Sequence, residues 1–318
     1  GGGDLHVFIV GATGLLGYHA TRLFLERGHS VATVSLPPMP AEELLPRAVD
    51  CRLGDIDELA DDELTEMMTG ADCLVFAAGR DERTTPRAPA YAYFHRHNVE
   101  SCTRMIGLAR RAKISRIVVL NSYFAYFDRL RPDLRLAERH PYVRSRTIQA
   151  EEAIRAAGDD MAMVILELPY IFGSMPGRTP IWKDVLFERF RKFSRVHYMD
   201  GGTACVTVRQ VAQAIVGAAE RGEAATRYPV GGTNVSWKEL YGKMHVLLGG
   251  AKRYRRTPKW LLKLLVRFVD LGNALRGLEA GLKHSRFMDL QCSETFIDPA
   301  IVAEALGVEP DDLDLALR

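Results

Sequence analysis

The stretch HPYVRSRTIQAEE, residues 140–152, places a tyrosine four residues before an arginine near the expected start of a helix. One helical turn separates Tyr142 from Arg146, so the two side chains share a face of that helix. A free tyrosine has a pKa of about 10, and it needs a nearby cation to exchange protons at neutral pH. The pair is therefore either proton-transfer machinery or the ordinary opening of an amphipathic helix.

A glycine-rich turn is the second candidate site. In VFIVGATGLLG, the residues Gly11, Gly14 and Gly17 follow an apolar run and lead into a helical pattern. A turn without Cβ atoms lets the backbone approach a pyrophosphate, and the helix N-terminus then binds that anion. The strand–turn–helix context favours dinucleotide binding over a purely structural turn.

The end of the second strand indicates which dinucleotide binds. An acidic residue there would hold the ribose hydroxyls of NAD, and a nearby arginine would accept the phosphate of NADP. This sequence has Ser35 and Leu36, followed by PPMP. No carboxylate stands there to repel a phosphate, so we expect NADP or NAD with a weak preference for NADP.

The elements that position these residues alternate between short apolar runs and helical patterns. The pattern predicts an α/β protein with a Rossmann-type doubly wound parallel sheet, buried on both faces. The predicted strands cover residues 6–10, 30–35, 48–56, 72–79, 116–122 and 161–168.

The alternation of predicted strands and helices becomes irregular after about residue 175. We expect a dinucleotide-binding domain over residues 4–175, joined by about 204–234, and a mainly substrate-binding smaller domain over 176–318. The stretch 176–198 is rich in Arg, Lys and aromatic residues. A basic run from Lys252 to Lys263 leads into an apolar helix. We favour a solvated loop and a packing helix there, and leave open contact with anionic lipid or a phosphorylated substrate.

These blocks together resemble the extended short-chain dehydrogenase/reductase family of the NAD-dependent epimerase/dehydratase type. The resemblance runs through most of the chain in the expected order. It rests on GATGLLG, GDI, FAAG, HNVES, VVLNSYFAY, PYVRSR, LPYIFG, VGGTNVSWKEL and FIDPAIVAEALGVEP.

The resemblance implies roles for individual residues. Tyr142 would be the general acid/base, Ser122 would hydrogen-bond the same substrate oxygen, and the basic residue one turn later would hold the nicotinamide ribose. The implied cofactor-binding residues are Gly11, Thr13, Gly14, Leu15, Leu16, Gly17, Ser35, Asp55, Ile56, Ala77, Ala78, Gly79, Asn98, Leu120, Asn121, Tyr142, Arg146, Pro169, Tyr170 and Ile171.

Four positions depart from the family pattern. Arg146 stands where the family has lysine. A guanidinium keeps the positive charge, and so can still lower the pKa of Tyr142, but it cannot release a proton. Glu167 stands in place of the usual arginine, which weakens the case for a nucleotide-sugar substrate. Tyr170 and Gln210 replace an asparagine and an aspartate, and we interpret both as structural.

The predicted function is an NAD(P)-dependent oxidoreductase that acts on a hydroxyl or ketone of a small molecule. Two alternatives stay open: a nucleotide-sugar epimerase/dehydratase, and a dinucleotide-binding regulator that has lost catalysis because of Arg146. Family analogy also suggests a homodimer.

Composition limits the remaining classes. The chain has 42 Lys and Arg against 40 Asp and Glu, which gives no argument for a nucleic-acid partner. No apolar run is long enough to span a membrane. The five cysteines are widely spaced and form no metal-ligand pattern, so we predict no metal site and a cytoplasmic location with reduced thiols.

Overall fold

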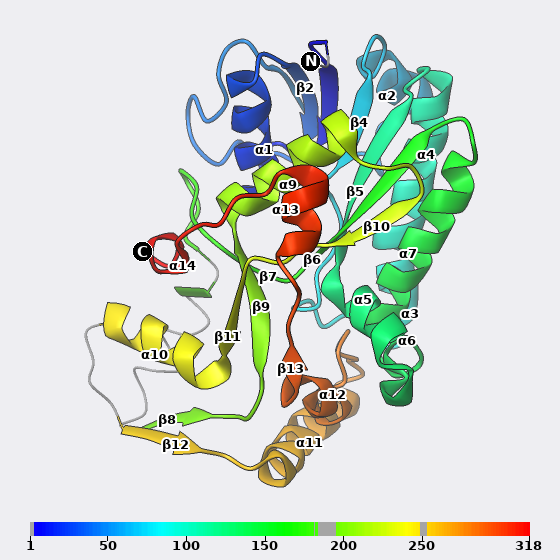
Figure 1. The fold of residues 1–318 in the computed structure, drawn as a ribbon. Helices are drawn as coiled ribbons and strands as arrows, with labels where there is room; N and C mark the ends of the chain where they lie inside the picture. The colour runs from blue at the N-terminus through cyan, green and yellow to red at the C-terminus, as the bar shows by residue number, and fades with distance from the viewer. Residues whose placement is uncertain (1–2, 181, 184–194, 249–252) are drawn as a thin grey trace.

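A computed structural model describes residues 3–180, 182–183, 195–248 and 253–318. The predicted α/β class and doubly wound parallel sheet are confirmed. Seven parallel strands lie in the order β10-β6-β5-β4-β1-β2-β3 (Figure 1). Their bounds are His6–Val10 (β1), Ser30–Ser35 (β2), Asp50–Leu53 (β3), Cys73–Phe76 (β4), Arg116–Ser122 (β5), Ala162–Leu168 (β6) and Thr226–Pro229 (β10).

Helices cover both faces of this sheet, as a parallel sheet requires. They are α1 (Leu15–Glu26), α2 (Asp61–Met67), α4 (Ser101–Arg111), α7 (Pro141–Ala157) and α9 (Val208–Arg221). Helices α3 (Ala90–Phe94), α5 (Tyr123–Leu130) and α6 (Leu136–Arg139) pack against α7. A π-helical segment, His95–Glu100, joins α3 to α4, and a 3-10 turn, Pro132–Leu134, follows α5.

The C-terminal half adds two smaller sheets. Strands β7 (Tyr170–Phe172), β9 (Gly202–Thr207), β11 (Thr233–Ser236) and β13 (Glu294–Thr295) form one, and β8 (Arg195–Tyr198) with β12 (Arg253–Arg256) forms the other. Helix α9 and strand β10 return to the large sheet, within the predicted joining segment 204–234. The predicted aromatic stretch 176–198 lies partly outside the described residues.

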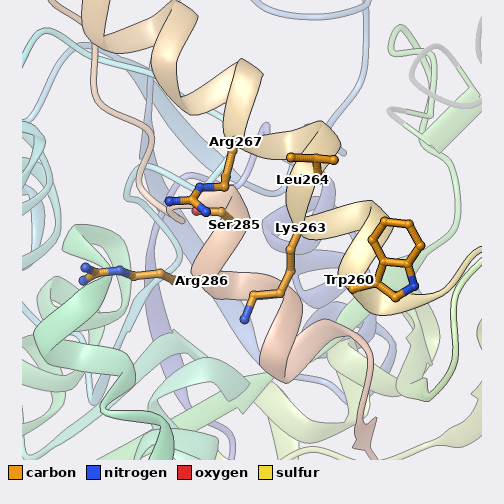
Figure 2. A pocket seen from close by; sticks show the side chains of 6 residues that line it. All are labelled: Trp260, Lys263, Leu264, Arg267, Ser285 and Arg286. Atoms are coloured by element: carbon orange, nitrogen blue, oxygen red, sulfur yellow. The ribbon is translucent and has the colours of Figure 1, made fainter.

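Among the described residues of this half, the remaining helices are α10 (Trp237–Leu247), α11 (Lys259–Leu275), α12 (His284–Gln291), α13 (Ala300–Leu306) and α14 (Leu313–Ala316). Helices α11 and α12 lie against each other below the large sheet in Figure 1. Figure 2 shows the side chains of these two helices that line a shallow depression of ≈ 500 Å³.

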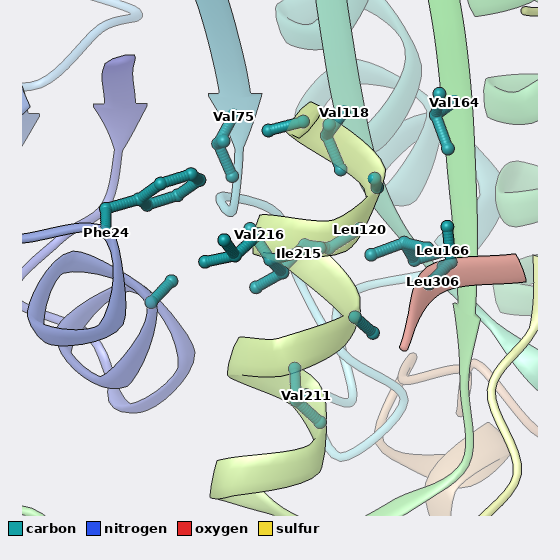
Figure 3. Packing of buried hydrophobic residues seen from close by; sticks show 14 of the residues in the cluster. Phe24, Val75, Val118, Leu120, Val164, Leu166, Val211, Ile215, Val216 and Leu306 are labelled. Atoms are coloured by element: carbon teal, nitrogen blue, oxygen red, sulfur yellow. The ribbon is translucent and has the colours of Figure 1, made fainter. Parts of the chain in front are cut away.

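Alternate strand residues build one core on each face of the large sheet. Val118 and Val164 face α9, where they pack with Ile215 (Figure 3). Their neighbours Ile117 and Ile165 face α4 and α7 on the opposite side. This two-sided burial fixes the register of the strands, and it holds the carboxyl ends of β1, β4 and β5 at one edge, where the predicted site residues lie.

Candidate active site

The glycine turn has a geometry that only glycine permits. Gly11 adopts a φ of +98°. A Cβ on Gly17 would lie 2.2 Å from the Gly11 carbonyl oxygen, so α1 could not pack this close to the turn. Gly14 is the N-cap of α1, no side chain caps it, and the first turn holds no acidic residue. These features fit a dinucleotide pyrophosphate.

Ser35, the last residue of β2, forms a hydrogen bond with the glycine turn. Its hydroxyl accepts a hydrogen bond from the Thr13 amide at 3.3 Å and lies 3.1 Å from the Thr33 hydroxyl. The side chain is 2% exposed. Ser35 therefore fastens the turn to β2, and its hydroxyl is directed at the protein backbone.

A second group of predicted residues meets at the end of β4. Asn98 accepts a hydrogen bond from the Arg80 amide at 2.7 Å and donates to the Arg80 carbonyl and to Ser145. A Cβ on Gly79 would lie 2.9 Å from the Asn98 amide oxygen and 3.4 Å from the guanidinium of Arg146. The π-helical segment that carries Asn98 is a type of distortion that often occurs at functional sites.

The predicted Tyr142, Ser122 and Arg146 also come together. Tyr142 lies in the first turn of α7, and the Nε of Arg146 donates to its hydroxyl at 3.1 Å. Ser122 ends β5 and caps α5, where its hydroxyl oxygen accepts a hydrogen bond from the Phe124 amide. All three side chains are less than a tenth exposed.

The charge state of Tyr142 follows from its surroundings. Burial raises the pKa of the phenol above its usual value, while the charge of Arg146 and hydrogen bonds from Arg146 and Ser122 lower it. The predicted influence of Arg146 is present, but burial outweighs it. Tyr142 is therefore a neutral hydrogen-bond donor at neutral pH.

A buried amide holds Arg146 in place. Gln149 accepts from the Arg146 Nη1 at 2.9 Å and from Asn121 at 3.0 Å, and Asn121 also donates to the Arg146 carbonyl. The sequence analysis did not identify Gln149. Its position three residues after Arg146 on the same helix face could have indicated it.

A match to a known protein family identifies the family of this chain. The sequence profile described as the NAD dependent epimerase/dehydratase family matches residues 7–231. The chain belongs to this family. It is a family of enzymes, and the resemblance inferred from the sequence is confirmed.

Individual members of the family differ in what they act on. The 4-hydroxy-2-methyl-3-oxo-4-farnesyl-3,4-dihydroquinoline-1-oxide ketoreductase of Stigmatella aurantiaca is 28% identical over 235 residues, which cover 70% of this chain and 67% of that protein.

Two solved structures share the fold over 99% of this chain. A nucleoside-diphosphate-sugar epimerase from Pseudomonas aeruginosa, covered over 95% of its length, has a TM-score of 0.72 at 19% identity. The Bordetella bronchiseptica enzyme WbmH in complex with NAD+, covered over 96%, has a TM-score of 0.71 at 17% identity. At these identities the likeness shows the fold.

Other predicted cofactor-binding residues make contacts outside the group of Tyr142, Ser122 and Arg146. Asp55 accepts from the Asp57 amide in its own loop, and the Ile56 carbonyl accepts from Arg104. No described contact joins either residue to the glycine turn. Tyr170 follows Pro169, and its ring lies 6.1 Å from that of Tyr123. Leu120 and Ile171 belong to the core on the α9 face, and Ala77 lies beside Gly11.

Glu167 and Gln210, which both differ from the family pattern, form contacts with neighbouring side chains in the fold. Glu167 is fully buried and forms a two-point ion pair with Arg129, at 2.7 and 2.9 Å. Gln210 closes a capping box with Thr207 at the start of α9. The interpretation of Gln210 as structural is confirmed.

Two further residues of the site were missed. A Cβ on Gly281 would lie 2.9 Å from the Cβ of Tyr142, and the Gly281 carbonyl accepts from the Tyr142 amide. Glu82, in the loop after β4, acts electrostatically on Tyr142 and Arg146, and burial raises the pKa of its carboxyl. The location of Glu82 after the carboxyl end of a central strand could have indicated it.

Within the described ranges, His, Cys, Asp and Glu form no group able to hold a metal ion. The five cysteines are unpaired. Among the helices of residues 3–180, 182–183, 195–248 and 253–318, none is both long and apolar enough to cross a membrane.

Proposed function

We propose that this protein is an NAD(P)-dependent oxidoreductase that reduces a ketone of an apolar small molecule. The observation that carries the proposal is the hydroxyl of Tyr142, which is buried, neutral and within hydrogen-bond reach of Arg146 and Ser122. A neutral phenol is suited to give a proton to a carbonyl oxygen as that oxygen gains negative charge.

The division of roles follows from the chemistry of each group. A nicotinamide cofactor bound at the glycine turn supplies a hydride. Tyr142 donates its proton to the substrate oxygen. The Ser122 oxygen accepts from the Phe124 amide, and its hydroxyl hydrogen, which reaches the Tyr142 oxygen in the free protein, turns to orient the substrate oxygen. Arg146 stabilises the phenolate that remains, through its Nε–H.

An aromatic cluster packs around the Tyr142 ring and holds it in an apolar setting. The rings of Phe94 and Phe124 lie 5.6 and 6.4 Å from that of Tyr142. Phe287 from α12 lies 5.4 Å from Phe124. Aromatic side chains bury large apolar area. The ketoreductase relative, named for a farnesylated oxo-dihydroquinoline, agrees in both the reaction and the apolar character of its compound.

Nucleotide-sugar epimerisation is the runner-up within the same family. It draws support from the fold shared with such epimerases. It is less favoured because Glu167 occupies the usual arginine position and is bound in its ion pair with Arg129.

The cofactor preference is a finer proposal. We infer that NADP is preferred over NAD, because β2 ends at Ser35, Leu36 follows it, and neither side chain carries a negative charge. The ratio of kcat/KM for NADPH and NADH measures this. A higher value with NADH would contradict it.

The function is tested by incubating the full chain with NADPH or NADH and a panel of ketones. The panel should span prenylated quinolines, steroids and small aliphatic ketones, and loss of reduced nicotinamide absorbance reports turnover. Parallel incubations with UDP-glucose and UDP-glucuronic acid report epimerisation. Reduction of apolar ketones supports the proposal. Conversion of nucleotide sugars alone, or cofactor binding without any turnover, would overturn it.

A further inference from the structure

Helix α11 turns its apolar side to solvent. Trp260, Leu264, Phe268, Leu271 and Leu275 recur at the spacing of one helix face. Their exposed fractions run from 47% for Leu264 to 81% for Leu275. No residue of this 17-residue helix is fully buried. We call these five side chains the α11 apolar face. The packing helix favoured from the sequence is therefore wrong for this side of α11.

Polar side chains on the inward-facing side of α11 bind it to the rest of the protein. Lys259 and Lys263 form ion pairs with Asp289 on α12, at 3.5 and 2.9 Å. Asp270 accepts from the ring and the amide of His284. These contacts fix the rotation of the helix. A rotation of α11 that buried the apolar face would break these ion pairs and hydrogen bonds. The contacts therefore keep the apolar face exposed.

The surroundings of this face are strongly basic. Residues 253–289 carry nine Lys and Arg against three Asp and Glu, whereas the whole chain carries 42 against 40. Arg267 and Arg286 take part in no ion pair with any described residue. Both line the depression between α11 and α12, together with Trp260, Leu264 and other side chains of these helices (Figure 2).

We propose that α11 lies on the surface of an anionic lipid bilayer. Its apolar face would enter the boundary between headgroups and acyl chains, and Arg267 and Arg286 would contact lipid phosphates. Helices with Trp, Phe and Leu on one side and basic residues beside them bind membranes in this way. Each basic residue near the surface strengthens the attraction to anionic lipid.

Charge argues against a second copy of the chain as the occupant. A two-fold pairing through α11 would place two patches of like charge against each other. An anionic surface complements the same patch. The inference is independent of the proposed reaction, although the segment after α11 reaches the site, where the Gly281 carbonyl accepts from the Tyr142 amide.

Vesicle flotation of the full chain tests the inference. Vesicles of phosphatidylcholine alone are compared with vesicles of phosphatidylcholine and phosphatidylglycerol in equal parts. We expect binding to the mixed vesicles at low salt, and at least a tenfold weaker partition into the neutral ones. Added salt should release the protein, because screening weakens attraction between exposed charges.

Variants locate the contact. Leu264→Ser with Phe268→Ser should lower the partition by about tenfold or more through lost apolar burial. Arg267→Glu should lower it by about tenfold through charge reversal. The matched controls are Leu315→Ser on α14, where the leucine is 62% exposed, and Arg47→Glu, where the arginine side chain is 96% exposed. Both controls should bind as the parent chain does.

A second readout is the tryptophan emission of the full chain. Mixed vesicles should shift it to shorter wavelength, and Trp260→Phe should abolish this shift. Absence of binding, equal binding to neutral vesicles, or binding unchanged in the α11 variants would overturn the proposal. A dimer that forms in solution and dissociates with Phe268→Ser, without vesicle binding, would assign the face to a second copy instead.

Discussion

Helices α7 and α11 are both 17 residues long, yet they relate side-chain chemistry to burial in opposite ways. Helix α7 buries Ser145, Arg146 and Gln149, which are polar. Helix α11 leaves Trp260 and Phe268 more than 60% exposed. Buried polar groups and exposed large apolar groups are the informative exceptions to ordinary burial.

Each exception is maintained by specific partners. On α7, the Gln149 amide oxygen accepts from Arg146 and from Asn121, so each of these two buried donors has an acceptor inside the protein. On α11, the ion pairs of Lys259 and Lys263 with Asp289 fix the rotation of the helix and leave its apolar face exposed. Under the two proposals, α7 serves a reaction and α11 serves a surface contact, so substitutions in the two helices should have different consequences.

The largest effect is expected at Arg146. Arg146→Ala removes the donor to the Tyr142 hydroxyl and the positive charge beside it, so kcat/KM should fall by about a hundredfold or more. Arg146→Lys retains a cation and should keep or raise turnover. Steady-state kinetics of the two variants provide the measurement. Equal residual activity in both would exclude a catalytic part for this residue.

Gln149 tests the internal network of α7. Gln149→Ala leaves Arg146 Nη1 and the Asn121 amide without their acceptor, so the free energy of unfolding should drop by about 2 kcal/mol. Denaturant titration measures this change. Gln149→Glu, which restores an acceptor, is the matched comparison, and similar stability of the alanine variant and the parent would contradict the network.

Glu82 is expected to alter the pH profile. Its negative charge raises the pKa of Tyr142, so Glu82→Gln should lower that pKa. Because reduction needs the protonated phenol, the alkaline fall in kcat/KM should move to lower pH, by less than about one pH unit. The exposed Glu63 on α2 offers a control, Glu63→Gln, with no shift expected. A shift to higher pH in Glu82→Gln would refute this assignment.

The smallest effect is expected on the α11 apolar face. Phe268→Ser should change the free energy of unfolding by no more than about 0.5 kcal/mol, as for other surface positions. The same denaturant titration provides the value. A loss of several kcal/mol would show that Phe268 packs in the folded chain, and the contrast between α7 and α11 would then disappear.

Much of the fold and of the site could be predicted from the sequence. Two local features are present in the folded structure as the sequence predicts them. One is the strand–turn–helix context of Gly11, Gly14 and Gly17, and the other is the one-turn spacing of Tyr142 and Arg146. Local spacing carries this information because both patterns lie within single βα or helical units.

The rest depends on contacts between distant segments. Gly281 reaches Tyr142 across 139 positions of sequence, and Glu82 reaches it from the loop after β4. The periodicity of a sequence carries no information about contacts between segments that are far apart in the chain. The exposure of the α11 apolar face could not be predicted from the sequence either. The hydrophobic period of α11 is equally compatible with a buried apolar face and with an exposed one.

The central claim is that the phenol of Tyr142 delivers the proton in carbonyl reduction. Tyr142→Phe retains the ring among Phe94 and Phe124 and removes only the hydroxyl. Single-turnover reduction should be measured beside nicotinamide binding in the same preparation. The account predicts unchanged cofactor affinity and a rate lower by about a hundredfold or more. Turnover within a few-fold of the parent chain would contradict it.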